Sequence, residues 1–250
     1  MPLQLLFVLV SILLALAGTT FSQATERIVQ VSTHDLEQSQ KLSPQVLFKP
    51  AGSGQPPTTR GAGSRNDRTC AQDTITQPLA LTALVPSQQF GLTWAERPTL
   101  WVYLPKTSAR QLVLSIREAG NLPHSQSFLP ITGEAGVMGI QVAATAPALE
   151  VGKSYQWAVV LVCGDRPSPN DPVVTAWMRR VLPSPSIEPP EAPLDRAALY
   201  GEQGIWYDAL TTLAEAYRAQ PHDSTLTQIW AEFLAQSEVG LGEIATMPLH

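Results

Sequence analysis

The chain has few charged residues. They make up 15% of its 250 positions, whereas roughly 25% is usual in a soluble domain. Acidic residues exceed basic ones by 21 to 16, which gives a formal net charge of −5, and no block of basic residues occurs. A nucleic-acid-binding domain would carry such a block, so we expect no nucleic-acid partner. Hydrophobic residues make up 44%, which allows a sizeable core in one domain or two small ones.

The sequence also lacks the motifs of common enzyme classes. It contains no G-x-S-x-G elbow, no P-loop, no Rossmann glycine fingerprint and no H-E-x-x-H. Its four histidines fall in predicted loops or tails; they are His34, His124, His222 and His250. The carboxylates considered for a glycosidase pair lie beside Gly or Pro or in predicted turns; they are Glu118, Glu134, Glu150, Asp165 and Asp171. We therefore expect no metal, no cofactor and no catalytic residues.

Long hydrophobic runs are absent except near the N-terminus. The apolar run Leu3–Ala17 is about 15 residues long, which is short of the roughly 20 that span a bilayer. Small residues follow at Ser22 and Ala24, the two positions that a signal peptidase reads. We therefore predict a secretory signal over residues 1–24, although no Lys or Arg precedes the run; the alternative is a membrane anchor or a core helix. The mature protein is then expected in the periplasm or outside the cell, without stable membrane insertion.

Cysteine is scarce, with one residue at Cys70 and one at Cys163. In an exported chain an even count of cysteines favours a disulfide, which here would join the start of the folded domain to its penultimate strand. The alternative is a pair of buried free thiols. No C-x-x-C occurs, so neither a thioredoxin-like redox site nor a zinc knuckle is supported.

Residues 25–66 are predicted to form a disordered or extended tail. Within 49–67 the only apolar side chains apart from proline are two alanines, too few to offset the entropy of ordering the segment. Val46–Phe48 is the stretch expected to dock, as a short strand. A small basic cluster at Arg60, Arg65 and Arg68 is interpreted as a solvated linker or, alternatively, as a contact with an anionic partner.

Short apolar runs broken by Pro and Gly fill residues 67–182. They are 79–85, 99–104, 111–117, 125–131, 137–142, 154–163 and 173–182. Leu112, Leu114 and Ile116 alternate with polar residues, and the run 154–163 alternates in the same way; a period of two is typical of strands. The pattern predicts an antiparallel β-sandwich of about seven strands.

The C-terminal part of the chain has a helical pattern. Residues 183–193 are rich in proline and are predicted to be a stiff linker, after which 194–250 form an α-hairpin packed on the sandwich. Asp195 is the expected N-cap, and Gly201 and Gly204 are expected to divide the first arm into a short and a longer helix. The second arm should end near Gly240. The spacing also matches one tetratricopeptide repeat, so the alternative is a half-repeat that docks on a partner.

Five aromatic side chains are candidates for an interaction surface. Trp101 and Tyr103 lie on one face of a predicted strand, with Leu100, Val102 and Leu104 on the other. If the aliphatic face points inward, the aromatic pair forms a platform; the interpretation that the aromatics belong to the core is preferred, because large aromatics dominate burial energetics. Trp206, Tyr207 and Trp230 form the corresponding candidate surface on the helices.

Several ordered segments together resemble a known family. They are RGAGSR (60–65), LTALVP (81–86), GLT (91–93), PTLWVYLP (98–105), LEVGKSYQW (149–157), VC (162–163), GIWYDAL (204–210) and VGL (239–241). The chain resembles the cyanobacterial family catalogued as domain of unknown function 928, from about residue 48 to the end. The resemblance implies a cyanobacterial exported protein and implies no activity, because the family has no established catalytic or binding residues.

We therefore predict an exported, non-enzymatic interaction module of the cyanobacterial cell envelope with a protein partner. The second hypothesis is a carbohydrate-binding β-sandwich that reads envelope polysaccharide through aromatic side chains, and the third is a hydrolase of unknown substrate. A glycan binder requires exposed aromatics on one sheet face or at loop tips. A protein adaptor requires an apolar patch near the helices, and an enzyme requires a cleft with convergent polar groups.

Overall fold

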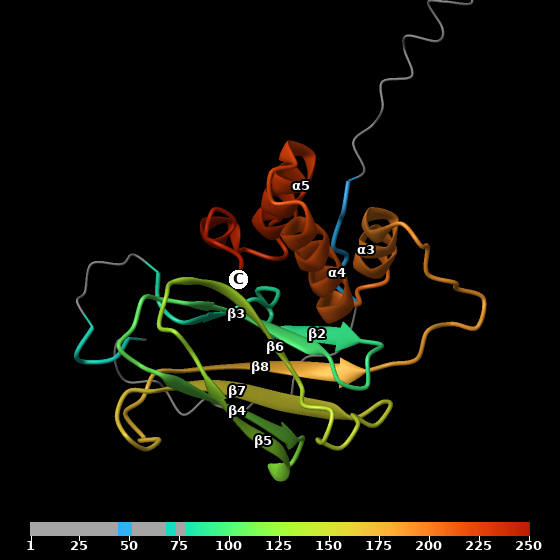
Figure 1. Cartoon of the computed structure of the whole chain (residues 1–250). Helices are drawn as coiled ribbons and strands as arrows, with labels where there is room; N and C mark the ends of the chain where they lie inside the picture. The colour runs from blue at the N-terminus through green and yellow to red at the C-terminus, as the bar shows by residue number, and fades with distance from the viewer. Residues whose placement is uncertain (1–44, 52–68, 74–78) are drawn as a thin grey trace, which may run out of the picture. The chain divides into compact units, whose positions relative to one another are not determined.

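A computed structural model describes residues 45–51, 69–73 and 79–250 of the chain (Figure 1). The predicted signal peptide, residues 25–44 and 52–66 of the predicted tail, and Arg60, Arg65 and Arg68 lie outside these ranges. Within the ranges, no helix is long and apolar enough to cross a membrane. All described residues belong to one compact unit.

The described β-structure consists of two sheets. The three-stranded sheet has the order β1-β3-β6, with bounds Thr82–Ala83, Thr99–Leu104 and Gly136–Gln141. The five-stranded sheet has the order β2-β8-β7-β4-β5, with bounds Phe90–Thr93, Val173–Arg180, Ser154–Val162, Gln111–Glu118 and Leu122–Pro130. The expected mostly-β architecture is therefore present. The expectation of antiparallel strands alone is wrong, because β2 pairs with β8 in parallel.

Strand β2 is the one the sequence pattern did not indicate. It is only four residues long, and Gly91 interrupts its apolar character. This glycine faces the helices: a Cβ added to it would lie 2.9 Å from Cε2 of Tyr207 and 3.0 Å from Cβ of Trp206. Gly91 therefore has two effects: it weakens the hydrophobic pattern by which the strand could be predicted, and it allows α4 to approach the strand closely.

The helical region contains three α-helices and a 3₁₀ turn: α3 (Pro193–Glu202), α4 (Trp206–Ala219), α5 (Ser224–Ala235) and η1 (Gly242–Ile244). The predicted division near Gly201 and Gly204 is confirmed, so α4 and α5 form the hairpin and α3 is a separate element. Two predicted ends are wrong. Helix α3 begins at Pro193, whose fixed φ suits the first helical turn, and Asp195 lies within that turn and is not the N-cap. Helix α5 ends at Ala235, five residues before Gly240.

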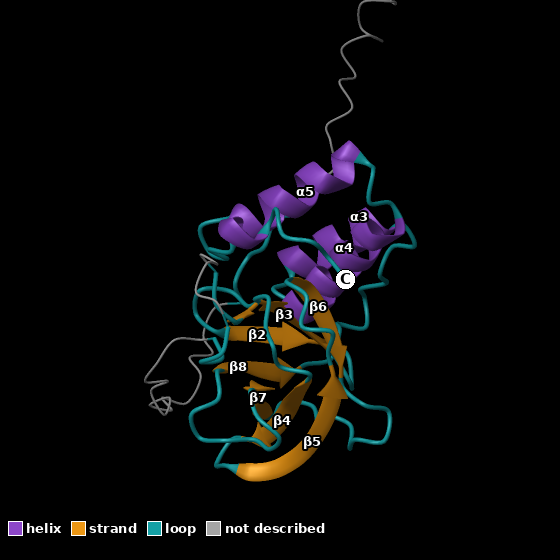
Figure 2. Cartoon of the chain, turned by 60° about the vertical axis from the view of Figure 1, so that its left-hand side comes forward, coloured by secondary structure: helices purple, strands orange, loops and turns teal. Residues whose placement is uncertain are grey.

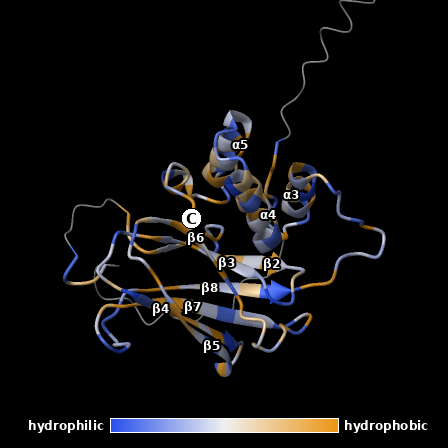
Figure 3. Ribbon diagram, viewed as in Figure 1, coloured by the Kyte–Doolittle hydropathy of each residue, from blue (hydrophilic) through white to orange (hydrophobic). Residues whose placement is uncertain are grey.

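The helices pack against the sheets on one side. In Figures 1 and 2 they lie next to β2 and β3, while β5 forms the far edge of the five-stranded sheet. Each helix carries apolar and polar residues along its length (Figure 3), as expected for an amphipathic helix on a core. Strand β3 is buried on both faces because α4 covers the face opposite the second sheet; there Trp101 Nε1 donates a hydrogen bond to Oγ1 of Thr211 at 3.0 Å.

The first turn of α4, Trp206–Asp208, holds the helices on the sheets, and we call it the α4 anchor. Trp206 Nε1 donates to the carbonyl of Leu84 at 3.0 Å. The hydroxyl of Tyr207 accepts a hydrogen bond from Nε1 of Trp157 at 2.7 Å and donates to the carbonyl of Trp177 at 3.0 Å. These partners lie in three separate stretches of the chain, so one helical turn joins the end of β1 to β7 and β8. Burial raises the pKa of the Tyr207 hydroxyl, which therefore keeps its proton and its donor role.

Asp208 completes the α4 anchor. Its Oδ2 accepts hydrogen bonds from Oγ1 of Thr93 at 2.7 Å and from the backbone N–H of Trp94 at 3.2 Å, at the end of β2. Burial raises the pKa of this half-buried carboxyl, and the hydrogen bonds from Thr93 and Trp94 oppose that rise. The position at the N-terminal end of a helix also favours a negative charge.

We expect the variant Asp208→Asn to become more stable relative to the natural chain as the pH rises. The folded state holds the Asp208 proton more tightly than the unfolded chain, whose carboxyl titrates near about 3.9. The stability contributed by this group is therefore present below that pH and is lost as pH rises through the raised pKa. Urea unfolding of both chains at pH 4 and pH 7 measures the difference in free energy of unfolding, variant minus natural chain, and a difference that falls as the pH rises would contradict this account. Asp208→Ala, which leaves two donors unpaired, should cost about 1–3 kcal/mol at pH 4 and less at pH 7, because it removes the same titrating carboxyl.

Two buried tryptophans differ in whether the indole N–H forms a hydrogen bond. Trp230 is fully buried, and among the described residues its Nε1 has no hydrogen-bond partner, whereas Nε1 of Trp206 is bonded to Leu84. Trp206→Phe removes a bond and leaves a carbonyl unpaired, while Trp230→Phe removes a donor that has no partner. We expect Trp206→Phe to lower the free energy of unfolding by about 1–2 kcal/mol more than Trp230→Phe. Equal losses by urea denaturation would show that the bond contributes nothing.

Candidate ligand-binding groove

The five aromatic residues proposed as an interaction surface are all inside the protein. None is more than 3% exposed; they are Trp101, Tyr103, Trp206, Tyr207 and Trp230. The surface hypothesis is therefore wrong for these five residues, and the interpretation that Trp101 and Tyr103 belong to the core is confirmed. The physical reason is that α4 covers the second face of β3, so that both faces of the strand bury large side chains. A binding site must be built from other residues.

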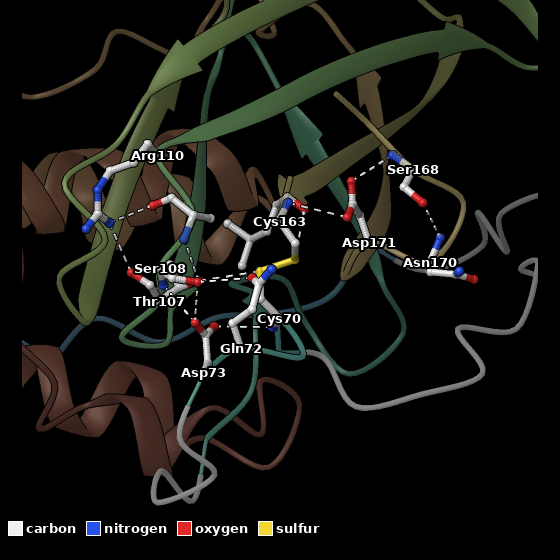
Figure 4. Close-up of a disulfide and its surroundings, with 12 residues drawn as sticks. Cys70, Gln72, Asp73, Thr107, Ser108, Arg110, Cys163, Ser168, Asn170 and Asp171 are labelled. Carbon is white, nitrogen blue, oxygen red and sulfur yellow. Dashed lines mark hydrogen bonds between the residues drawn. A yellow bond between two sulfur atoms is a disulfide. The ribbon is translucent and has the colours of Figure 1, made fainter. Parts of the chain in front are cut away.

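The predicted disulfide between Cys70 and Cys163 is present, with its Cα atoms 5.5 Å apart (Figure 4). Cys163 directly follows β7, the penultimate strand, so the predicted connection is confirmed. On the Cys70 side, Asp73 accepts hydrogen bonds from the N–H and the hydroxyl of Ser108 at 2.7 and 2.8 Å. Burial acts to raise the pKa of Asp73, but hydrogen bonds from Ser108, Thr107 and Cys70 outweigh it and lower that pKa. The carboxylate therefore stays charged and ties the two segments together.

On the other side of the disulfide, Asp171 fixes the loop between β7 and β8. This buried carboxylate accepts hydrogen bonds from the N–H of Cys163 at 3.3 Å and from the N–H of Ser168 at 2.8 Å (Figure 4). Both ends of the loop are thus fixed: one by the disulfide at Cys163, and the other by Asp171, whose carboxylate accepts hydrogen bonds from backbone N–H groups of the loop. The tip of the loop places Pro167 at one end of a groove on the outward face of the five-stranded sheet.

Strand register creates this groove, because it aligns small side chains across the sheet. Three rows of outward-facing side chains run across β5, β4, β7 and β8. The two flanking rows are Phe128-Val113-Val160-Val173 and Pro123-Arg117-Gln156-Trp177, and the middle row is Gln126-Ser115-Ala158-Thr175. Ser115 and Ala158 are short, and larger side chains stand on either side of them. The result is a groove of about 290 Å³ over β4, β7 and part of β5.

The two walls of the groove differ in chemistry. One wall is apolar: Val113 is only 3% exposed although it faces outward, because its cross-strand partners Phe128 and Val160 flank it. Phe128 itself is 54% exposed and presents an aromatic ring beside the groove. The other wall and the end near β5 carry the polar groups of Arg117, Gln126 and Gln156. The residues that line the groove include no carboxylate, imidazole or thiol.

The carboxylates considered for hydrolysis lie elsewhere. Glu118 and Glu150 both bind the ammonium group of Lys153, with Nζ–Oε1 distances of 3.1 and 2.8 Å. Their hydrogen bonds raise the pKa of Lys153, so the group remains an ammonium between two carboxylates. Asp171 serves the loop described above. In the described part of the chain, no group of three or more His, Cys, Asp and Glu is placed to hold a metal ion.

Two of the three described histidines have hydrogen-bond partners, and His222 is exposed in the turn between α4 and α5. His124 Nε2 lies 3.1 Å from the carbonyl of Pro147, and its ring packs edge-on against Tyr155. It is the extra residue of β5 at the bulge opposite Ile116 and Arg117. His250 Nε2 lies 3.0 Å from the carbonyl of Ala135. His34 lies outside the described residues.

Removing the disulfide should cost stability. The bond joins residues 93 positions apart. The chain-entropy model gives a loop of that length about 4–5 kcal/mol of folding stability, and removal of a native disulfide typically costs about 2–5 kcal/mol. We expect the double variant Cys70→Ser/Cys163→Ser to lose that amount in urea unfolding. The reduced natural chain serves as the control and should match the variant. If the oxidised natural chain is no more stable than the variant, the loop does not constrain the unfolded state.

Comparisons with known proteins identify the family. No curated protein matches the chain at a significant level. Among solved structures, the chain is similar to the fn3 domain of human collagen alpha-1(XX) chain, with 13% identity over 48% of this chain and 99% of that domain. The TM-score of 0.26 is too low to establish a common fold. A family model covers residues 60–249, most of the chain, and thereby supports the resemblance seen in the sequence. The chain belongs to the family described as Domain of Unknown Function (DUF928).

Proposed function

We propose that this chain is an exported, non-enzymatic binding module of the cyanobacterial cell envelope, and that its sheet groove holds a segment of polysaccharide. The observation that carries this proposal is the row of short side chains, Ser115 and Ala158, between an apolar wall and a polar wall. A sugar ring has apolar C–H faces and a polar rim of hydroxyls. An aromatic ring such as that of Phe128 can pack against the C–H faces, and amide and guanidinium groups can form hydrogen bonds with the hydroxyls.

The position of the groove in the sheet favours a saccharide over an extended peptide. A peptide that binds along a sheet edge pairs its backbone with the edge strand, but this groove lies over β4 and β7, which are internal strands. The backbones of β4 and β7 are already paired on both sides, so a peptide lying here would find only side chains for its N–H and C=O groups. A hydroxyl-rich ligand has no such repeating backbone requirement, and side-chain donors and acceptors suffice for it.

Export is supported by two features. Disulfides such as Cys70–Cys163 form and persist mainly in oxidising compartments outside the cytosol. The N-terminal apolar run ends in the residue pattern of a signal-peptidase site. Protease treatment of intact cells and sequencing of the mature N-terminus test this part. A mature chain that begins at Met1 would argue against it.

A protein partner is the second candidate. The prediction of a protein adaptor required an exposed apolar patch near the helices, and the aromatic residues of the helices do not form one because they are buried. A different observation supports this candidate: Gln236, at the end of α5, already holds an extended segment of the chain by its backbone, at Val46 and Phe48.

Binding to the groove can be tested with defined polysaccharides. Retardation in native gels that contain alginate, a polyuronate, or laminarin, a neutral glucan, measures the affinity. We expect Ala158→Leu to abolish retardation, because the larger side chain fills the floor of the groove, and Phe128→Ala to weaken it by about tenfold or more. Because both side chains lie on the outer face, we expect little change in stability.

Leu122→Ala is the matched control. Leu122 lies on the same strand as Phe128 and is 60% exposed, but its cross-strand partner is Glu118, whereas Phe128 pairs with Val113, a residue that lines the groove. It should leave retardation unchanged. If Ala158→Leu and Leu122→Ala behave alike, the groove is not the site. If neither polysaccharide retards the natural chain and a panel of envelope glycans gives the same result, the proposal fails.

A further inference from the structure

A short N-terminal segment, residues 45–51, lies across the helices, and we call it the strap. In Figure 1 it runs beside α3 and α5. Its side chains alternate: Val46 and Phe48 are buried at 3% and 5% exposure, whereas Leu47 is 40% exposed. The sequence predicted that Val46–Phe48 would dock as a strand. Docking is confirmed, but the strap pairs with no strand, and it lies inside the tail predicted to be disordered.

The strap is held by its backbone. The side-chain amide of Gln236, at the end of α5, accepts a hydrogen bond from the N–H of Phe48 at 2.8 Å and donates to the carbonyl of Val46 at 3.0 Å. The N–H of Lys49 donates to the carbonyl of Gly201 in α3 at 2.9 Å. A single amide that bonds both a donor and an acceptor of one extended segment recognises it much as a neighbouring strand would.

Side chains then give the site its specificity. The ring of Phe48 packs edge-on against Trp206 of the α4 anchor, with centroids 4.9 Å apart. Gly201 is required for the fit, because a Cβ there would lie 2.2 Å from the carbonyl oxygen of Leu47. The basic residue Lys49 lies 3.8 Å from Glu202 in an exposed ion pair. The site therefore accepts an aliphatic residue at position 46, any residue at 47, an aromatic residue at 48 and a basic residue at 49.

We propose that the surface formed by Gly201, Trp206 and Gln236, which holds the strap and which we call the channel, is a peptide-binding site that also takes the same segment, residues 45–51, from a second copy of the chain. The two Gln236 contacts join residues 188 and 190 positions apart, so they do not depend on which copy supplies the strap. Residues 52–68 connect the strap to the next described segment. A connection of that length spans at most about 60 Å, which is enough to reach an adjacent molecule.

The physical competition is between the chain's own strap and the strap of a neighbour. A tether of this kind gives its own strap an effective concentration on the order of 1 mM. Exchange between copies therefore becomes substantial only at high local concentration, as when several copies bind one polymer. This inference does not depend on the identity of the groove ligand, and its test uses no polysaccharide.

The first test asks whether the channel binds its segment as a free peptide. A specific protease site placed within residues 58–64 of the full chain allows the strap to be cut from the disulfide-bonded domain. A labelled peptide of residues 44–51 should bind the cut chain at least tenfold more tightly than the uncut chain, by fluorescence anisotropy. The variant Gln236→Ala in the cut chain should lower that affinity at least tenfold. A cut chain that keeps its circular dichroism and binds no peptide at millimolar concentration would overturn the proposal.

Peptide variants provide the matched controls. Phe48→Ala in the peptide should lower affinity at least tenfold, whereas Leu47→Ala should leave it within about twofold, because Leu47 points outward. Equal effects of the two changes would mean that the peptide binds elsewhere and would count against the channel.

The second test uses two intact chains that complement each other. A Gln236→Ala chain has a normal strap and a weakened channel, and a Phe48→Ala chain has the opposite. By sedimentation, an equal mixture should contain pairs that neither variant forms alone at the same total concentration. A folded mixture that stays monomeric would rule out exchange between copies. If either variant is unfolded by circular dichroism, the peptide experiment on the cut chain decides the matter.

Discussion

The seating of a single helical turn on the two sheets is the interaction on which the rest of the fold depends. Trp206, Tyr207 and Asp208 are consecutive, yet their polar atoms reach the end of β1, strands β7 and β8, and the end of β2. The bonds of Trp206 and Tyr207 are buried and that of Asp208 is part-buried, so a missing partner would leave a poorly solvated polar group, which costs free energy. The turn therefore fixes the position of α4. Because α3 and α5 pack beside α4, it also positions the channel that receives the strap.

Much of this arrangement follows from patterns that the sequence displays. Period-two alternation located β4 and β7, and the two cysteines with the apolar N-terminus indicated the disulfide. The parallel strand β2 was missed because Gly91, the residue that admits the α4 anchor, removes the apolar signal from a four-residue strand. The predicted cap at Asp195 was wrong because Pro193 starts the helix two residues earlier. The strand was missed because a contact between distant segments decides the structure there, whereas the cap was misplaced because one local signal, a proline in the first helical turn, outweighs another.

The candidate groove could not be found from the sequence for a different reason. Alternation shows that Ser115 and Ala158 share the outward face of their strands, but only the register of β4 against β7 places them opposite each other. A shift of one residue would turn one strand's side chains to the other face and remove the groove. The aromatic residues drew attention in the sequence because they are large, and for the same reason they are in the core. Among the aromatics of the outward face, Phe128 at the sheet edge is the one with a largely exposed ring.

The small extent of the groove has a consequence for how much of a ligand it contacts. Neighbouring strands are about 4.8 Å apart, so the lining from β5 across β4 to β7 extends over about 10 Å. Such a short footprint reads only a brief stretch of a polymer, and each contact contributes a small free energy. Occupancy of a long chain then rises with the number of repeats it offers and with the number of copies gathered on it. Under the proposed function, the molecule would thus respond to the density of a repeated pattern more than to the presence of a single unit.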